Sequence, residues 1–159
     1  MRKSSLPLEQ APELVGRWCR QLGFNVKAAF ESSGDEALFP NRLVLSGPEA
    51  GWLAGNKGQA LDALQFLLHE AQGEREEARL AYLDAESFRL FRMKEVVAMA
   101  GFAAEKARSL GSYTFSSLSP RERRWVHMVL SRQPGFATES EGTGTFKALK
   151  VIRVKEAAR

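Results

Sequence analysis

Residues 55–65 of this 159-residue chain read GNKGQALDALQ, a turn between two glycines that leads directly into an amphipathic helix. Glycines let the backbone close tightly, so that N–H groups point outward at a helix start with a partial positive charge. Lys57 adds a full positive charge. This pattern suits a phosphate group, although a structural turn between two helices explains the same spacing. It is not a Walker loop, because no glycine directly precedes the lysine and no Ser or Thr follows it, so nucleotide hydrolysis is disfavoured.

Hydrophobic periodicity predicts the elements on either side of the turn. The expected order is one helix, two strands, two helices that flank the glycines, and a third strand, α-β-β-α-α-β. We expect the first helix at residues 7–22 and the first two strands at 24–30 and 37–45. A short helix that ends at residue 54, a helix at 59–71 and a strand at 78–83 should follow.

A long helix is expected to join this first part of the chain to a smaller second one. It begins at Asp84, a good N-cap residue, and Gly111 ends it near residue 110. A strand, a helix that opens with Ser-Pro-Arg-Glu and a hairpin then predict the order β-α-β-β. The first strand is expected at residues 113–118, the helix begins at residue 119, and the two strands of the hairpin lie at 136–139 and 145–155.

The second motif is RRWVH at residues 123–127. Arg123 and His127 are four residues apart and therefore project from one face of a helix. A guanidinium beside an imidazole suits a phosphate or a base, while a solvated basic face explains the same pattern. The apolar residues of this helix are interpreted as its buried side: Trp125, Val126, Val129 and Leu130.

Charge is distributed unevenly along the chain, whose net charge is +4. Residues 1–105 carry 12 Lys and Arg against 15 Asp and Glu, a net charge of −3, whereas residues 106–159 carry 11 against 4, a net charge of +7. The asymmetry favours a polyanionic partner, most simply a nucleic acid, near the last third of the chain. An anionic membrane surface or an acidic protein would respond to the same field.

Composition excludes several classes of protein. Cys19 is the only cysteine and there are two histidines, which excludes internal disulfides and cysteine-cluster metal sites, so we expect no cofactor, no metal and no catalytic residues. No apolar run is long enough for a signal peptide or a membrane helix, so we expect no membrane insertion. Cys19 is predicted to lie in the core, and Phe88, Phe91 and Phe102 are predicted to be buried between the two units.

The succession of motifs resembles the bacterial Jag family, in which a type II KH domain is followed by an R-x-x-x-H (Arg-three-His) domain. The resemblance covers about residues 8–155. It implies an α+β fold: a type II KH domain over residues 1–85, and a linking helix with a small β-α-β-β R-x-x-x-H domain over residues 86–159, without the family's extra N-terminal domain. Four stretches carry it: residues 55–65, which look like GxxGQTLDALQ, 84–89 like D-x-x-x-aromatic-R, 122–127 like ERRxxH, and 138–142 like T-x-S-x-G.

The resemblance also implies a function. It implies a cytoplasmic, non-enzymatic bacterial protein that binds single-stranded RNA, as a post-transcriptional regulator or RNA chaperone linked to cell elongation, cell shape and envelope growth. A homodimer, or a heterodimer with a small KH protein, is an expected assembly. Single-stranded DNA binding and a protein-interaction scaffold that dimerises through its KH domain are the alternatives.

The predicted nucleic-acid-binding residues form two groups. In the first, the glycine-flanked turn holds the backbone of about four nucleotides and the following helix shapes a groove for bases. In the second, the Arg and His pair contacts the strand with other cations nearby. The first group is Gly55, Asn56, Lys57, Gly58 and Gln59, and the second is Arg123, Arg124, His127, Lys147 and Lys150.

Overall fold

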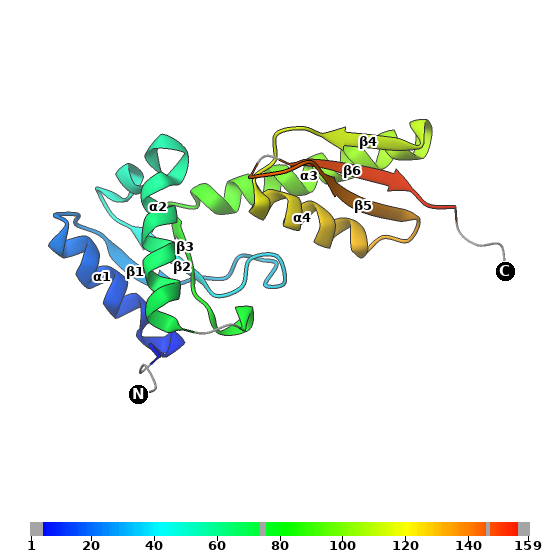
Figure 1. The fold of residues 1–159 in the computed structure, drawn as a ribbon. Coiled ribbons are helices and arrows are strands. Elements are labelled where there is room, and N and C mark those ends of the chain that lie inside the picture. Colours follow the sequence, from blue (N-terminus) through cyan, green and yellow to red (C-terminus); the bar gives the residue numbers. More distant parts are fainter. Residues whose placement is uncertain (1–4, 74–75, 146, 156–159) are drawn as a thin grey trace. The chain divides into compact units, whose positions relative to one another are not determined.

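A computed structural model describes residues 5–73, 76–145 and 147–155 of the chain. The chain divides into two compact units, Met1–Leu90 and Phe91–Arg159, and the boundary falls within the long helix α3 (Phe88–Leu110) (Figure 1). Each unit contains a three-stranded sheet with helices packed on it. The fold is therefore of the mixed α+β class, as predicted.

The first unit is built on a sheet of order β1-β2-β3, in which β1 is antiparallel to β2 and β3 is parallel to β2. The helix α2 is interrupted at residues 55–58, where the backbone is not helical, so the predicted pair of helices around the glycines is confirmed. The elements are a 3-10 helix (Leu8–Gln10), α1 (Ala11–Gln21), β1 (Lys27–Phe30), β2 (Arg42–Ser46), α2 (Ala50–Gln72), a 3-10 helix (Glu77–Arg79) and β3 (Tyr82–Ala85).

The core of the first unit lies between one face of this sheet and the helices α1 and α2. Cys19 is fully buried there, as predicted, and burial raises the pKa of its thiol, so the side chain packs as a small neutral group. The other fully buried residues of this cluster with branched side chains are Val15, Leu43, Leu45, Leu53, Leu61, Leu68 and Leu83.

Two glutamines of α2 pair with the outer edge of β3. Gln65 Oε1 accepts a hydrogen bond from the Leu83 N–H at 2.7 Å, and Gln65 Nε2 donates to the Ala81 carbonyl at 2.7 Å. Further along the helix, Gln72 Oε1 accepts from the Ala81 N–H at 3.1 Å. These side chains take the place of a fourth strand, which protects the edge and fixes β3 along the second half of α2.

The strands of the first unit are shorter than predicted, because local turns take up their expected ends. The Phe24 N–H donates to the Cys19 carbonyl at 2.8 Å, so residues 24–26 complete the end of α1 before β1 begins. The Leu38 and Phe39 N–H groups both donate to the Asp35 carbonyl, which makes residues 35–39 a turn ahead of β2.

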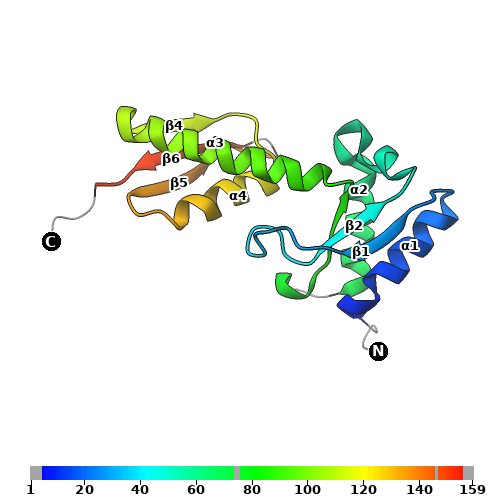
Figure 2. The same ribbon diagram turned by 180° about the vertical axis from the view of Figure 1, so that it is seen from behind.

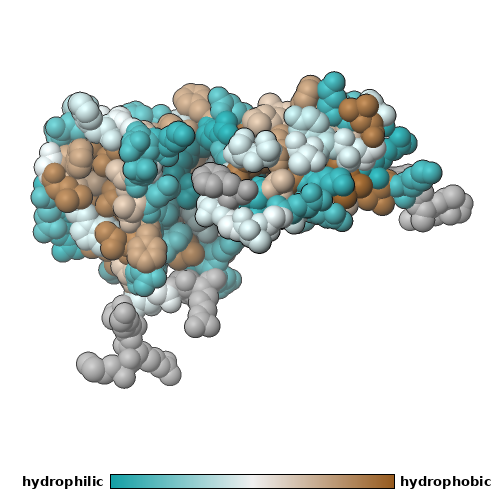
Figure 3. All heavy atoms as spheres, turned by 45° about the horizontal axis from the view of Figure 1, so that its top comes forward, coloured by the Kyte–Doolittle hydropathy of each residue, from teal (hydrophilic) through white to brown (hydrophobic). Residues whose placement is uncertain are grey.

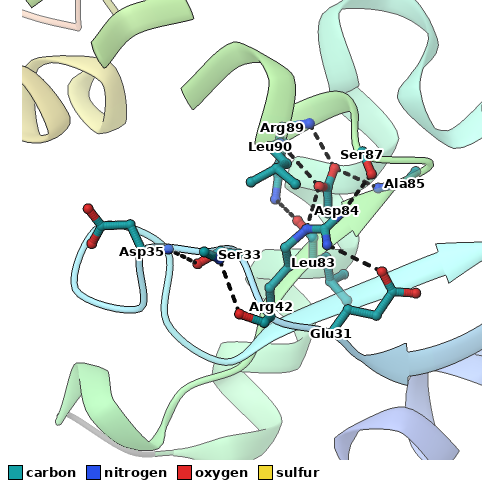
Figure 4. Close-up of polar contacts among 12 residues, drawn as sticks. Glu31, Ser33, Asp35, Arg42, Leu83, Asp84, Ala85, Ser87, Arg89 and Leu90 are labelled. Carbon is teal, nitrogen blue, oxygen red and sulfur yellow. Dashed lines mark hydrogen bonds and ion pairs between the residues drawn. The ribbon is translucent and has the colours of Figure 1, made fainter. Parts of the chain in front are cut away.

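Asp84 does not begin the long helix, contrary to the prediction. Parallel pairing with β2, where Asp84 lies opposite Val44, extends β3 to Ala85, and α3 begins only at Phe88. Asp84 nevertheless caps α3 from a distance. Its Oδ1 accepts from the Arg89 N–H at 2.7 Å and its Oδ2 from the Leu90 N–H at 3.1 Å (Figure 4).

The same carboxylate forms a buried ion pair with Arg42 of β2. Arg42 Nε donates to Asp84 Oδ2 at 2.9 Å, and both side chains are buried. The other guanidinium nitrogens of Arg42 reach Ser87 Oγ at 2.8 Å and the exposed Glu31 carboxylate at 3.4 Å. The backbone between β3 and α3, where Glu86 and Ser87 both have positive φ, is therefore held by charged hydrogen bonds (Figure 4).

The second unit is a fully antiparallel sheet of order β4-β6-β5. Its chain order after α3 is β-α-β-β, as predicted, with both helices on one face of the sheet (Figures 1 and 2). Ser119 caps α4 as expected, and with Glu122 it forms a capping box: Ser119 Oγ accepts from the Glu122 N–H at 3.3 Å, and Glu122 Oε2 accepts from the Ser119 N–H at 2.8 Å. The elements are β4 (Ser112–Phe115), α4 (Pro120–Ser131), β5 (Phe136–Glu141) and β6 (Ala148–Arg153).

Three phenylalanines of α3 are exposed, although the sequence predicts that they are buried. The exposed fractions of Phe88, Phe91 and Phe102 are 39%, 62% and 54%. In the second unit, α3 packs through its small side chains instead, which let a helix approach its neighbours closely. These buried residues are Val96, Ala100, Ala103, Ala104 and Ala107. On α4, Trp125, Val126 and Leu130 are buried as predicted, and Val129 is partly buried.

Two kinds of feature are absent from the residues that the structure describes. Across residues 5–73, 76–145 and 147–155, no helix combines the length and apolar character that crossing a membrane requires. Within the same ranges, no group of three or more His, Cys, Asp or Glu residues is placed to hold a metal ion.

We expect Asp84→Ala to lower the free energy of unfolding by about 3 kcal/mol, because it leaves the buried Arg42 guanidinium and two N–H groups of α3 without their acceptor. Urea denaturation followed by circular dichroism measures this. Glu31→Ala is the matched control: it removes the exposed partner of the same arginine and should cost less than about 1 kcal/mol. Equal losses of unfolding free energy in the two variants would show that the buried ion pair does not stabilise the fold more than the exposed one.

Candidate nucleic-acid interface

The Gly55–Gly58 turn is a run of left-handed backbone inside α2. After an extended Gly55 (ψ 163°), the φ angles of Asn56, Lys57 and Gly58 are 52°, 58° and 77°. A left-handed conformation costs an ordinary residue about 1–2 kcal/mol, and here two consecutive residues with side chains adopt it. Strain of this kind persists only where the surrounding structure imposes it, and it concentrates at binding sites.

Gly58 is buried against Phe88, the first residue of α3. A Cβ atom at this position would lie 3.1 Å from Phe88 Cε1, closer than ordinary packing allows. The positive φ of Gly58 disfavours any other residue for a second reason. On the outside of the turn, Asn56 Nδ2 donates to Gln59 Oε1 at 2.6 Å, which ties the left-handed residues to the start of the following helix.

The remaining residues of the turn face solvent. Gly55, Asn56, Lys57 and Gln59 are all exposed, and the helix that starts at Gln59 adds the partial positive charge of its N-terminus. The structure therefore presents a backbone turn without bulky cover, a helix start and a lysine on one surface. An anionic group such as a phosphate fits this combination.

Arg89 holds Phe88 in position beneath the turn. Arg89 Nη1 donates to the Leu83 carbonyl at 2.8 Å and to Gln65 Oε1 at 3.2 Å, and Nη2 donates to the Asp62 carboxylate, one helical turn after Gly58. Sequence reasoning did not assign a role to Phe88 or Arg89 in the site. The signal that could have found them is the stretch of residues 84–89, whose Asp and Arg both serve to fix the start of α3.

Arg123 of the second predicted group contacts the protein's own backbone. Its Nη1 donates to the carbonyls of Leu118 and Thr145 at 2.8 and 2.9 Å, and to that of Lys147 at 3.4 Å. The guanidinium thereby links the segment before α4 to the connection between β5 and β6. Arg123 therefore holds two backbone segments together and does not simply project into solvent.

His127 lies one turn further along α4 and is exposed. Its Nδ1 is 2.6 Å from Thr138 Oγ1 on β5, so the ring and the hydroxyl share a hydrogen bond that sets the orientation of the imidazole. Thr138 was not predicted as a site residue, but it opens the stretch of residues 138–142 that carries the resemblance.

Lys150 lies on the other face of the second sheet. Thr138 is paired with Val151, on the face that α4 covers, and neighbouring residues of a strand point to opposite faces. Lys150 occupies a row between Thr114 of β4 and Glu139 of β5, away from His127. Lys147, by contrast, lies beside Arg123, because its backbone carbonyl accepts a hydrogen bond from the Arg123 guanidinium. Arg124 follows Arg123 on α4 and is exposed.

Comparison with known proteins first defines a class. Residues 94–153, which run from α3 to the end of β6 and include both Arg123 and His127, match the family model of the Arg-three-His (R-x-x-x-H) domain. The predicted R-x-x-x-H character of the second unit is thus confirmed.

A particular relative extends the similarity into the first unit. The chain is 29% identical over 117 residues to the "RNA-binding protein KhpB" of Clostridium symbiosum. The alignment covers 72% of this chain and 53% of that protein, so the chain spans about half the length of the curated relative it matches.

Glu122 at the start of α4 is held ionised by its neighbours. Burial opposes its ionisation, but hydrogen bonds from Arg92 and from the Ser119 backbone outweigh burial, and the pKa of Glu122 is lowered from its ordinary value of 4.5. The same contact raises the pKa of Arg92. Glu122 therefore fixes the start of the helix that carries Arg123 and His127 to α3.

The lowered pKa of Glu122 predicts a pH dependence of stability. Since the folded state binds this proton more weakly than the unfolded chain, the contribution is complete above about pH 4.5 and is lost as the pH falls through the lowered value. We expect the thermal unfolding midpoint between pH 5 and pH 2.5 to fall less steeply for Glu122→Gln than for the native protein. Glu95→Gln, which removes the exposed partner of Arg92, should follow the native profile. Parallel profiles for native protein and Glu122→Gln would contradict this.

We expect Gly58→Ala to lower the free energy of unfolding by about 2 kcal/mol, because alanine disfavours the positive φ and its Cβ meets the Phe88 ring. Gly51→Ala in the same helix is the control. Gly51 has an ordinary φ and open space around its Cβ position, so that change should be neutral or stabilise by up to about 1 kcal/mol. Chemical denaturation of both variants measures the difference, and a neutral Gly58→Ala would show that the turn is not held as described.

Proposed function

We propose that this protein binds single-stranded RNA without catalysing a reaction on it, using one site in each unit. The observation that carries the proposal is the strained Gly55–Gly58 turn, which presents Lys57 and a helix start to solvent while Gly58 packs against the Phe88 ring. The match of residues 94–153 to the Arg-three-His domain and the similarity to a protein named as RNA-binding support the same conclusion.

The first unit is proposed to be a type II KH domain. Its element order is α-β-β-α-α-β, with the Gly-x-x-Gly turn between the two halves of α2, which is the order that the Jag resemblance implies. In such a domain the turn holds the backbone of about four nucleotides. Here Lys57 would attract a phosphate, Gly55 would let it approach the backbone, and Asn56 and Gln59 would border the path.

The second unit is proposed to add a contact through the cations Arg124 and Lys147 and the imidazole of His127. Arg123 contributes by holding the connection between β5 and β6 in place, and His127 presents an imidazole oriented by Thr138. Lys150 is proposed as a separate contact on the far face of the sheet, because its register excludes it from the His127 surface. The excess positive charge of residues 106–159 supports a nucleic-acid partner for this unit.

The cellular role is proposed from the same resemblance. It is post-transcriptional regulation or RNA chaperone activity that affects cell elongation. Pairing with a second copy or a small KH protein is part of the proposal, and a scaffold that dimerises through its first unit is the competing function.

We expect Lys57→Glu to weaken binding to an unstructured RNA of about ten nucleotides at least tenfold at low salt, because the change replaces attraction for a phosphate with repulsion. Lys27→Glu is the matched control: Lys27 is an exposed lysine on β1 of the same unit, and the same change of charge there should have less than about a threefold effect. Fluorescence anisotropy measures both affinities.

Three outcomes would contradict the proposed function. Equal weakening by both substitutions would mean that the net charge, rather than the turn, attracts RNA. Native affinity that does not change with salt would favour a protein partner, since log K should fall with log salt at a slope of about −0.7 for each phosphate neutralised on a single strand. Equal affinity for DNA of the same sequence would favour the single-stranded DNA alternative.

A further inference from the structure

Trp52 lies in the first half of α2, three residues before Gly55, and 77% of its side chain is exposed. It is the most exposed of the large hydrophobic side chains in the part of the chain that the structure describes. The other two tryptophans differ: Trp125 is buried and Trp18 is partly buried. An exposed indole buries little apolar surface and therefore adds little to the stability of the fold, so a role other than packing would explain its position.

The short helix of residues 50–54 fixes the direction of Trp52. Ala50 and Leu53 are buried in the core of the first unit and define the inner side of this helix. Because each residue turns a helix by about 100°, Trp52 projects from the opposite side, next to the exposed Gly51. The Glu49 carboxylate, which accepts from the Asn25 N–H, anchors the helix start, so the indole is held on a fixed support.

The residues that follow Trp52 along the chain are polar and include a lysine. Chain geometry keeps the Cα atoms of Trp52 and Gly55 within about 11 Å of each other. The exposed residues that follow are Gly55, Asn56 and Lys57, so the indole is close to the candidate anion-binding surface. Figure 3 shows hydrophobic side chains of the first unit at the surface among hydrophilic ones.

We propose that Trp52 stacks on a base of a single-stranded nucleic acid whose phosphates lie on the Gly55–Gly58 turn. This inference rests on the proposed function and adds to it a residue that contacts a base rather than the phosphates. Every base has a flat π face, so the contact adds affinity without a strong sequence preference. The turn would hold the negatively charged backbone, and the indole would cover the adjoining base.

The test compares Trp52→Ala with a matched variant, Phe66→Ala. Phe66 is 65% exposed and lies in the second half of α2, away from the turn in sequence. We expect Trp52→Ala to weaken binding of a short oligouridine by about 5- to 160-fold, the range found when an aromatic residue that stacks on a base is removed. Phe66→Ala should leave the affinity close to the native value, and both variants should keep the native thermal unfolding midpoint.

Three further measurements separate stacking from a merely structural effect. Oligouridine should quench the tryptophan fluorescence of the native protein, and this quenching should disappear in Trp52→Ala, since Trp52 is the well-exposed indole of the three. Trp52→Phe keeps a flat ring and should recover most of the affinity. Against an abasic ribose-phosphate oligomer of equal charge, the native protein and Trp52→Ala should bind alike.

The outcomes keep this inference distinct from the proposed function. If Lys57→Glu weakens RNA binding and Trp52→Ala does not, the stacking inference is wrong and the RNA-binding proposal stands. If the native protein does not bind oligouridine or any other single strand, the proposed function itself fails. If Trp52→Ala leaves RNA affinity unchanged but abolishes self-association in analytical ultracentrifugation, Trp52 belongs to a protein interface, and the inference is overturned.

Discussion

The carboxylate of Asp84 has no exposed surface and accepts four hydrogen bonds, from Arg42 Nε and from the N–H groups of Ala85, Arg89 and Leu90. A buried charge is tolerated only where its neighbours satisfy it this fully. The arrangement joins β2, β3 and the start of α3 at one point. It thereby decides where the strand ends and where the helix begins.

The position of Phe88 depends on this arrangement, and the geometry of the candidate site depends on Phe88. Arg89, whose N–H is bound by Asp84, reaches with its side chain to Asp62 and Gln65 on the second half of α2. The ring of the preceding residue then fills the space next to Gly58. A strained surface turn thus packs against a residue that a buried polar network holds in place, and this packing supports the left-handed conformation.

The second unit shows a similar division between groups that shape the surface and groups that face solvent. Arg123 holds three carbonyls, and Glu122 caps α4 and binds Arg92 of α3. His127 and Arg124 are exposed on the helix that these contacts position. An Arg and a His four residues apart therefore do not have equivalent roles. The match of this region to the Arg-three-His domain is consistent with both kinds of contribution.

Local preferences along the chain are enough to predict the element order, the break in α2 at the glycines, the start of α4 at Ser119, and the burial of Cys19 and Trp125, because each depends on nearby backbone preference or on hydrophobic periodicity. Tertiary structure alone decided the rest. Strand pairing moved Asp84 from the expected helix start into β3, and sheet register turned Lys150 away from His127. The phenylalanines of α3 are exposed because the small residues of this helix pack against the core instead. Which apolar face of a helix is buried depends on neighbours that are distant in sequence.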